Sequence, residues 1–278
     1  MQDLKRFFRT VRRGLKWRLG AWPSRARDPA AYKFYADLMT RGFEPNALID
    51  ILPAYKLIYV GVPKAASSTV KRALSALAGH DPASLADVHR RSQSGLAGPG
   101  DLGPSALYEL VRDPAVLRFA FVRNPYDRLV SCWADKYQGR PMVAGDAFMN
   151  VYLAYRSEAG STVKRGRDAT LSFADFVDMA IATCDSHTDP HWTRMDDILS
   201  MPGIALDFVG KSENFAADFE RVIDHTGRDE RLLKALPRMN RSARTGCRDY
   251  YDDELARRVF KAYEADFDRF GYAKTLPD

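Results

Sequence analysis

The sequence predicts a three-layer α/β fold, in which a central, mainly parallel β-sheet is flanked by helices. Two observations predict it. Short apolar and β-branched runs, typical of buried strands, alternate with segments whose apolar residues recur at helical spacing. The chain also has 278 residues, 46% of them hydrophobic, which is enough for a sizeable core and excludes global disorder. Strands joined through helices are expected to run parallel.

The first predicted strand is Lys56–Val62, an apolar run that ends at Pro63. A helix follows over about residues 70–77, where apolar residues recur at helical spacing, and Gly79 is a plausible stop. Residues 92–105 (SQSGLAGPGDLGPS) have the composition of a loop.

The second predicted strand, Leu117–Val122, precedes an Asn-Pro pair at Asn124 and a helix with one apolar face from Leu129 to Tyr137. Residues 138–170 have weak periodicity and many polar residues, which predicts a mobile region. Phe173–Ala182 is expected to be helical.

The last part of the chain contains a third strand, Leu206–Val209, a helix over Phe215–Gly227 and a final helix over Asp252–Phe270. In open parallel sheets, ligands bind beyond the carboxyl ends of the strands. The residues that follow the predicted strands are therefore the candidates for a site.

Residues 1–27 differ from the rest of the chain in charge. They contain nine Lys and Arg and one acidic residue, a net charge of +8, whereas the other residues include 33 basic and 35 acidic ones. Apolar residues from Leu4 to Leu15 follow helical spacing, which suits an anionic membrane surface; the alternative is a terminal helix with a solvated basic face. We expect a basic amphipathic extension over residues 1–45, ahead of a domain of residues 46–278 that does not bind nucleic acid.

Three cysteines, Cys132, Cys184 and Cys247, are far apart, and no CxxC pair occurs. This pattern predicts neither a zinc site nor a disulfide framework, and it is compatible with a reducing compartment. The sequence has no apolar run long enough for a bilayer span and no secretory signal pattern, so the expected location is the cytoplasm, with the membrane periphery as an alternative.

A candidate phosphate-binding loop follows the first strand. A helix N-terminus offers unpaired N–H groups that bind anions, and here small residues, hydroxyl groups and one lysine surround it. The alternative is an ordinary turn whose hydroxyl side chains cap the helix. The spacing is not that of a Walker A loop, which disfavours ATP-dependent phosphoryl transfer. The loop consists of Pro63, Lys64, Ala65, Ala66, Ser67, Ser68 and Thr69.

A second candidate anion site follows the second strand. Arg123 stands at the strand end, where a guanidinium can grip phosphate with two hydrogen bonds. Ser131, eight residues later, falls on the second turn of the helix and can face the same anion. Asp127 stabilises the first turn or pairs with Arg128. The alternative for Arg123 is a structural ion pair.

Together these stretches resemble the sulfotransferases that use 3′-phosphoadenosine 5′-phosphosulfate (PAPS), in particular the carbohydrate sulfotransferases of the chondroitin 4-O-sulfotransferase type. The loop at Pro63–Thr69 resembles their 5′-phosphosulfate loop, and Arg123–Ser131 resembles their 3′-phosphate motif. The resemblance covers roughly residues 50–275. Its other matching blocks are Leu206–Glu213, Asp218–Gly227 and Tyr250–Tyr272.

The resemblance implies a P-loop-like fold, a catalytic domain over residues 46–278, PAPS as the sulfuryl donor and no metal. Lys64 is expected to contact the bridging oxygen of the phosphosulfate, the three hydroxyl residues after Ala66 the 5′-phosphate, and Arg123 and Ser131 the 3′-phosphate. A later loop is expected to add donor contacts. The residues expected to bind PAPS are Pro63, Lys64, Ala65, Ala66, Ser67, Ser68, Thr69, Arg123, Ser131, Arg241 and Ser242.

The general base is expected to be His191 or Glu213, because a histidine or a desolvated carboxylate can be tuned to take a proton near neutral pH. His191-Trp192 resembles a His-Trp element of the same family, although the residues after Arg194 depart from the family pattern, which bears on the acceptor. The alternatives are a structural imidazole stacked near Trp192 and, for Glu213, an acid at the start of the helix at Phe215.

His187 lies close to His191 in the chain, and His89 is a further candidate for the acceptor site. The function that the resemblance implies is transfer of a sulfuryl group to a hydroxyl of a carbohydrate or glycolipid. The alternatives are an ATP-dependent kinase with a P-loop-like fold and a non-catalytic, membrane-associated nucleotide-binding protein.

Overall fold

The computed structural model describes most of the chain, and all statements below concern these parts of it. The described residues are 28–40, 44–81, 83, 87–142, 146–158, 160, 166–185, 188–235 and 247–277. The basic segment 1–27, His187, and the candidate donor-binding residues Arg241 and Ser242 lie outside the described residues.

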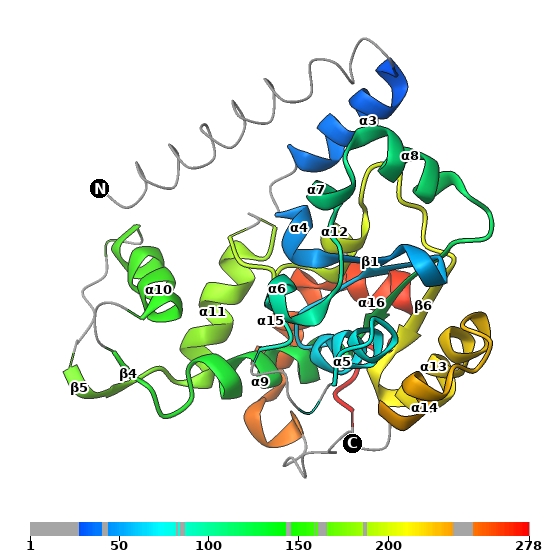
Figure 1. Ribbon diagram of the computed structural model, residues 1–278. Helices are drawn as coiled ribbons and strands as arrows, with labels where there is room; N and C mark the ends of the chain where they lie inside the picture. The colour runs from blue at the N-terminus through cyan, green and yellow to red at the C-terminus, as the bar shows by residue number, and fades with distance from the viewer. Residues whose placement is uncertain are drawn as a thin grey trace.

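A four-stranded sheet forms the centre of the molecule (Figure 1). Its strands are β1 (Ile49–Leu52), β2 (Leu57–Val60), β3 (Leu117–Val122) and β6 (Phe208–Lys211), in the order β1-β2-β3-β6. β2, β3 and β6 run parallel, and β1 pairs antiparallel with β2. The mainly parallel sheet predicted from the sequence is therefore confirmed.

The helices surround this sheet. Those of the first half are α3 (Pro29–Met39), α4 (Pro45–Leu48), α5 (Ser67–Leu77), α6 (Arg91–Ser94), α7 (Pro99–Leu102), α8 (Pro104–Arg112) and α9 (Pro125–Lys136). Those of the second half are α10 (Ala147–Glu158), α11 (Phe173–Thr183), α12 (Met195–Leu199), α13 (Phe215–His225), α14 (Glu230–Ala235), α15 (Asp253–Ala262) and α16 (Glu264–Phe270). Among the described residues, the 3₁₀ turns are η1 (Pro53–Tyr55), η2 (Ser212–Asn214) and η4 (Cys247–Tyr250).

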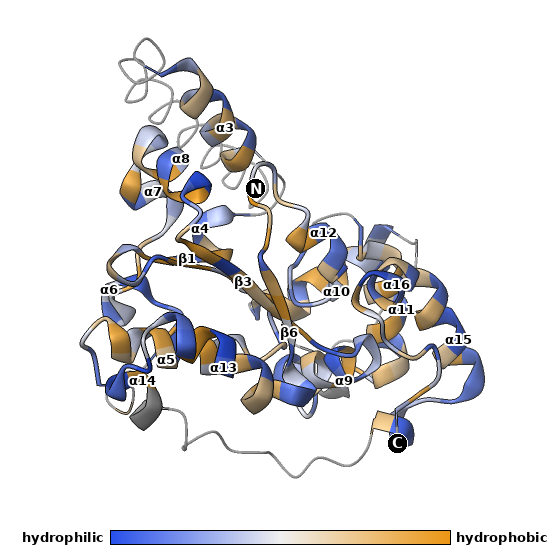
Figure 2. Cartoon of the chain, turned by 90° about the vertical axis from the view of Figure 1, so that its right-hand side faces the viewer, coloured by the Kyte–Doolittle hydropathy of each residue, from blue (hydrophilic) through white to orange (hydrophobic). Residues whose placement is uncertain are grey.

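Each face of the sheet has its own apolar core, because successive side chains of a strand point to opposite faces. Ile58 and Val60 of β2 pack with α3, α8 and α12, whereas Leu57 and Tyr59 pack with α5 and α13. Figure 2 shows α3, α4, α7 and α8 on one side of the sheet and α5, α13 and α14 on the other. Although α3 lies within the expected N-terminal extension, its Leu38 is fully buried in the core.

A third apolar cluster joins α9, α10, α11, α15 and α16 beside the sheet. Its largest buried side chains include Trp192, which is fully buried and packs edge-on against Phe176. Tyr263 is also buried there, and its hydroxyl donates to the Trp192 carbonyl oxygen at 2.5 Å. This cluster fixes α9, the helix that follows β3, against the segment that carries His191.

Some predictions about individual elements were wrong. The segment 92–105, predicted as a loop, contains α7 and the start of α8, each of which begins with a proline, a residue suited to the first helical position. The described part of the region 138–170, for which the sequence predicted no element, contains α10 and a two-stranded sheet of β4 (Pro141–Met142) and β5 (Gly166–Thr170).

Several element boundaries also differ from the prediction: the first strand, predicted as Lys56–Val62, is Leu57–Val60, and the third strand and the final helix differ as well. The third strand starts at Phe208. Just before it, the Asp207 carboxylate accepts hydrogen bonds from the backbone N–H and the guanidinium of Arg118 in the neighbouring strand. The predicted final helix is divided into α15 and α16 at Tyr263, whose φ of −109° and ψ of 19° are not helical. Its apolar spacing continues across the break, which is why the sequence showed one helix. None of the helices in the described part of the chain has the length and apolar character needed to span a bilayer.

Candidate functional site

The two predicted anion-binding elements lie side by side at the carboxyl ends of β2 and β3. These strands are parallel neighbours, with Val60 paired to Ala120, so the segments that follow them leave the same edge of the sheet. The Arg123 guanidinium Nη1 lies 3.5 Å from the Lys64 carbonyl oxygen. A single nucleotide can therefore contact both segments.

The backbone of the Lys64 loop has an unusual conformation. Lys64 and Ala66 both have positive φ angles, 68° and 61°, which non-glycine residues rarely adopt and which cost roughly 1 kcal/mol each. Ala66 is the N-cap of α5. Because alanine has no side-chain oxygen, the alternative in which a hydroxyl residue of the loop caps this helix is wrong. A strained loop that leaves a helix N-terminus uncapped by a side chain fits an anion-binding role.

Lys64 forms an ion pair with a residue that sequence reasoning missed, Asp135 of α9. Lys64 Nζ lies 2.9 Å from Asp135 Oδ2, and Lys136 Nζ lies 3.0 Å from the same oxygen. Burial lowers the pKa of Lys64, and the hydrogen bond with Asp135 opposes this shift. Burial alone would raise the pKa of Asp135, but hydrogen bonds from the two lysines lower it to about 2. The signal in the sequence was helical spacing, since Asp135 lies four residues after Ser131.

Glu213, a candidate base, contacts the turn that follows β3. Its Oε1 accepts from the Asn124 backbone N–H at 2.6 Å, and its Oε2 accepts from the Tyr272 hydroxyl at 3.2 Å. The α13 N-cap is Asn214, so Glu213 serves the Arg123–Asn124 turn rather than its own helix. These contacts suit a residue that orients the turn. Ser131, on α9, is buried, with 3% of its surface exposed.

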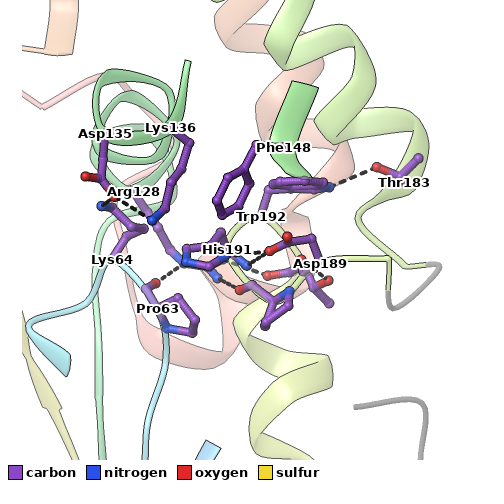
Figure 3. A network of polar contacts seen from close by, with 12 residues as sticks. Pro63, Lys64, Arg128, Asp135, Lys136, Phe148, Thr183, Asp189, His191 and Trp192 are labelled. Carbon is purple, nitrogen blue, oxygen red and sulfur yellow. Dashed lines mark hydrogen bonds and ion pairs between the residues drawn. The ribbon is translucent and has the colours of Figure 1, made fainter. Parts of the chain in front are cut away.

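Arg128 connects the donor loop to the segment that carries His191. Its guanidinium donates to the Pro63 carbonyl oxygen at 3.1 Å, and to the carbonyl oxygens of Pro190 and Thr193 at 2.7 Å each. The side chain is 1% exposed. The expectation that Arg128 pairs with Asp127 is therefore wrong, because α9 directs the guanidinium into the core. Figure 3 shows Arg128 between the Lys64–Asp135 pair and the His191 segment.

His191 forms a dyad with a carboxylate. Its Nδ1 lies 2.6 Å from Asp189 Oδ1, and the same oxygen accepts from the His191 backbone N–H at 2.8 Å. An Nδ1–H that donates to a carboxylate leaves Nε2 able to accept a proton. The ring meets the Phe148 ring edge-on at 5.4 Å between centroids. Trp192 is turned into the core, where its Nε1 donates to Thr183 Oγ1 at 2.9 Å (Figure 3).

Comparisons with known proteins agree with this geometry. A family model described as "Sulfotransferase family" matches residues 48–273. Carbohydrate sulfotransferase 8 of Homo sapiens is 28% identical over 272 residues, which cover 91% of this chain and 62% of that protein. Carbohydrate sulfotransferase 14 of Mus musculus is 30% identical over 174 residues, which cover 61% of this chain and 44% of that protein. Carbohydrate sulfotransferase 11 of Mus musculus is 25% identical over 252 residues, which cover 84% of this chain and 70% of that protein.

The chain thus spans less than two thirds of the length of the first of these relatives. A comparison with the solved structures finds no significant match. Among the described residues, no group of three or more His, Cys, Asp or Glu is arranged to hold a metal ion.

Replacing Arg128 with methionine should destabilise the fold by more than about 3 kcal/mol, because three carbonyl oxygens that contact the buried guanidinium lose their donor at once. Urea unfolding monitored by circular dichroism measures this change. The matched control is Arg257→Met on α15, where the side chain is 67% exposed and pairs with nearby Glu254, so its expected effect is within about 0.5 kcal/mol. Equal unfolding midpoints for the two variants would contradict the structural role of Arg128.

Proposed function

Because this chain belongs to the sulfotransferase family, we propose that it transfers a sulfuryl group from PAPS to a hydroxyl group of a carbohydrate acceptor. The observation that carries the proposal is the 3.5 Å approach of the Arg123 guanidinium to the Lys64 loop. PAPS differs from ATP in carrying a phosphate on the 3′ position of its ribose as well as a phosphosulfate on the 5′ position. Two adjacent anion sites at one sheet edge match that arrangement.

The residues present fit the donor. The uncapped N-terminus of α5 and the hydroxyl groups of Ser67, Ser68 and Thr69 suit the 5′-phosphosulfate. Arg123 suits the 3′-phosphate. Glu213 stabilises the turn that carries Arg123 by accepting a hydrogen bond from the Asn124 backbone N–H. Carbohydrate as the acceptor class is proposed from the names of the relatives, all of which are carbohydrate sulfotransferases.

In the proposed reaction, the acceptor oxygen forms a bond to sulfur while the bond between sulfur and the bridging phosphate oxygen breaks. His191 Nε2 takes the acceptor's hydroxyl proton, and Asp189 stabilises the resulting imidazolium through Nδ1. Lys64 stabilises the negative charge that develops on the leaving phosphate, so adenosine 3′,5′-bisphosphate is released. Positioning and electrostatics supply most of the catalysis, as they do in phosphoryl transfer.

Calorimetry with adenosine 3′,5′-bisphosphate, AMP and ATP tests the donor assignment. We expect the bisphosphate to bind at least about tenfold more tightly than AMP, because only the bisphosphate reaches Arg123 as well as the α5 N-terminus. Labelled sulfate transfer to a panel of saccharides then tests the reaction. Equal affinity for the bisphosphate and AMP would remove the proposal, ADP production from ATP would favour a kinase, and binding without transfer to any acceptor would favour a non-catalytic protein.

His191→Ala should lower kcat by at least about a hundredfold, because it removes the group that accepts the acceptor's proton. The affinity for adenosine 3′,5′-bisphosphate should change less than about twofold, since in the proposed reaction the ring contacts the acceptor and not the nucleotide. His225→Ala is the matched control: this exposed histidine contacts the carbonyl oxygens of Tyr55 and Lys56 at the opposite end of β2. Full turnover in His191→Ala would exclude it as the base and leave Glu213 as the candidate.

We also propose that residues 1–27 bind an anionic membrane surface, with the enzyme acting in the cytoplasm at the membrane periphery. The support is their net charge of +8 and the helical spacing of their apolar residues. In a co-sedimentation assay with vesicles that contain anionic lipid, we expect the full chain to pellet with the vesicles. A variant without residues 1–27 should stay in the supernatant. Equal retention of both proteins would contradict this assignment.

A further inference from the structure

A second histidine, His89, reaches the donor loop from outside it. Its Nε2 lies 2.9 Å from Ser68 Oγ, at the second residue of α5. The turn that carries it is held by its own hydrogen bonds: the His89 backbone N–H donates to Asp87 Oδ1 at 2.9 Å, and the Asp87 N–H donates to Gln93 Oε1 at 3.1 Å. The imidazole is thus fixed against one hydroxyl of the predicted phosphate loop.

Burial favours the neutral form of His89, and the charges around it act in both directions. Burial lowers its pKa most, and the positive charge of Lys71 on α5 lowers it further. Asp87 on its own turn and Asp50 on β1 act in the opposite direction. Asp50 is 2% exposed and already paired with Lys71, with 2.6 Å between Oδ2 and Nζ. His191, in the segment that follows α11, also acts to lower the pKa of His89.

We propose that His89 is a positioning residue for the sulfuryl donor: its imidazole holds Ser68 Oγ so that the Ser68 hydroxyl proton points at an oxygen of the 5′-phosphosulfate. The inference rests on the proposed function and assigns a role to a residue outside the donor loop. It requires no bond to form or break at His89 itself.

The hydrogen-bonding capacity of the two groups supports this role. A serine hydroxyl has one proton to donate and two lone pairs that accept. When Nε2 carries a proton and donates to Ser68 Oγ, the hydroxyl proton is directed to the anion, and the donation polarises it. In the other tautomer the Ser68 hydroxyl donates to Nε2, so its proton is not available for a hydrogen bond to the anion. An anion bound at the loop therefore selects the form of His89 with a proton on Nε2.

This selection links donor binding to protonation. The imidazolium also carries a proton on Nε2 and adds a positive charge, so a bound anionic nucleotide raises the pKa of His89 above its value in the free protein. Between these two pKa values the nucleotide complex holds more protons than the free protein, so affinity rises as the pH falls through that interval and levels off below it. Ser67 and Thr69 supply no such titration.

Calorimetry with adenosine 3′,5′-bisphosphate at pH 5.5 to 8 tests the proposal. His89→Ala should weaken binding at pH 7 by about fivefold to tenfold. The expected reason is that the Ser68 hydroxyl, no longer oriented by the imidazole, loses its hydrogen bond to the charged nucleotide. Ser68→Ala should weaken it equally, and the double variant no more than either single one. His89→Gln, whose amide nitrogen reaches about the position of Nε2, should retain affinity within about twofold but lose the His89 contribution to the pH dependence. His225→Ala again serves as the control and should match the unaltered protein.

The outcomes separate this inference from the proposed function. If the unaltered protein prefers the bisphosphate to AMP but His89→Ala binds it equally well, the inference fails and the proposed function stands. If His89→Ala lowers kcat with unchanged nucleotide binding, His89 acts on the acceptor and the positioning role is overturned. Additive effects of His89→Ala and Ser68→Ala would overturn it too. If the unaltered protein shows no preference for the bisphosphate, both fall together.

Discussion

The buried guanidinium of Arg128 connects three segments that are distant in the sequence: α9, which carries it, the donor loop, and the segment around His191. It donates to the carbonyl oxygen of Pro63 in the donor loop, and to those of Pro190 and Thr193 around His191. Burial lowers the pKa of Arg128, and the negative charge of Asp266 opposes that shift. A buried charge is costly unless it is paired and hydrogen-bonded, so the segments are stable only when they converge on this side chain. The distance between the donor loop and the candidate base follows from that convergence.

Helix α9 distributes the other contacts of the site along one face. Arg128, Ser131 and Asp135 are separated by three and four residues, so they lie above one another on the helix. Arg128 binds the donor-loop backbone, Asp135 binds the Lys64 side chain, and Ser131 lies between them. The opposite face of α9 packs into the apolar cluster with α11 and α15. Packing of this helix therefore sets the geometry around Lys64 and, through Arg128, that of the segment carrying His191.

Sequence periodicity predicted the elements that carry the donor site because their signals are local. β2 and β3 are short apolar runs, and α5 and α9 have apolar faces at helical spacing. β1 was missed because Asp50 interrupts its apolar run, although that carboxylate is buried against Lys71. α10 was missed because its apolar residues do not form a clear stripe. In both cases tertiary contacts outweigh the local pattern.

By itself the sequence determined the fold class, the order of strand and helix elements, and the two strand ends whose residue types suit phosphate binding. These depend on side-chain chemistry and spacing within a few residues. Only the tertiary structure decided that Asp135 pairs with Lys64, that Arg128 turns inward, and that His89 contacts Ser68. Each of these contacts joins different elements of the fold. Their partners are chosen by how helices pack on the sheet, and no spacing along the chain encodes that choice.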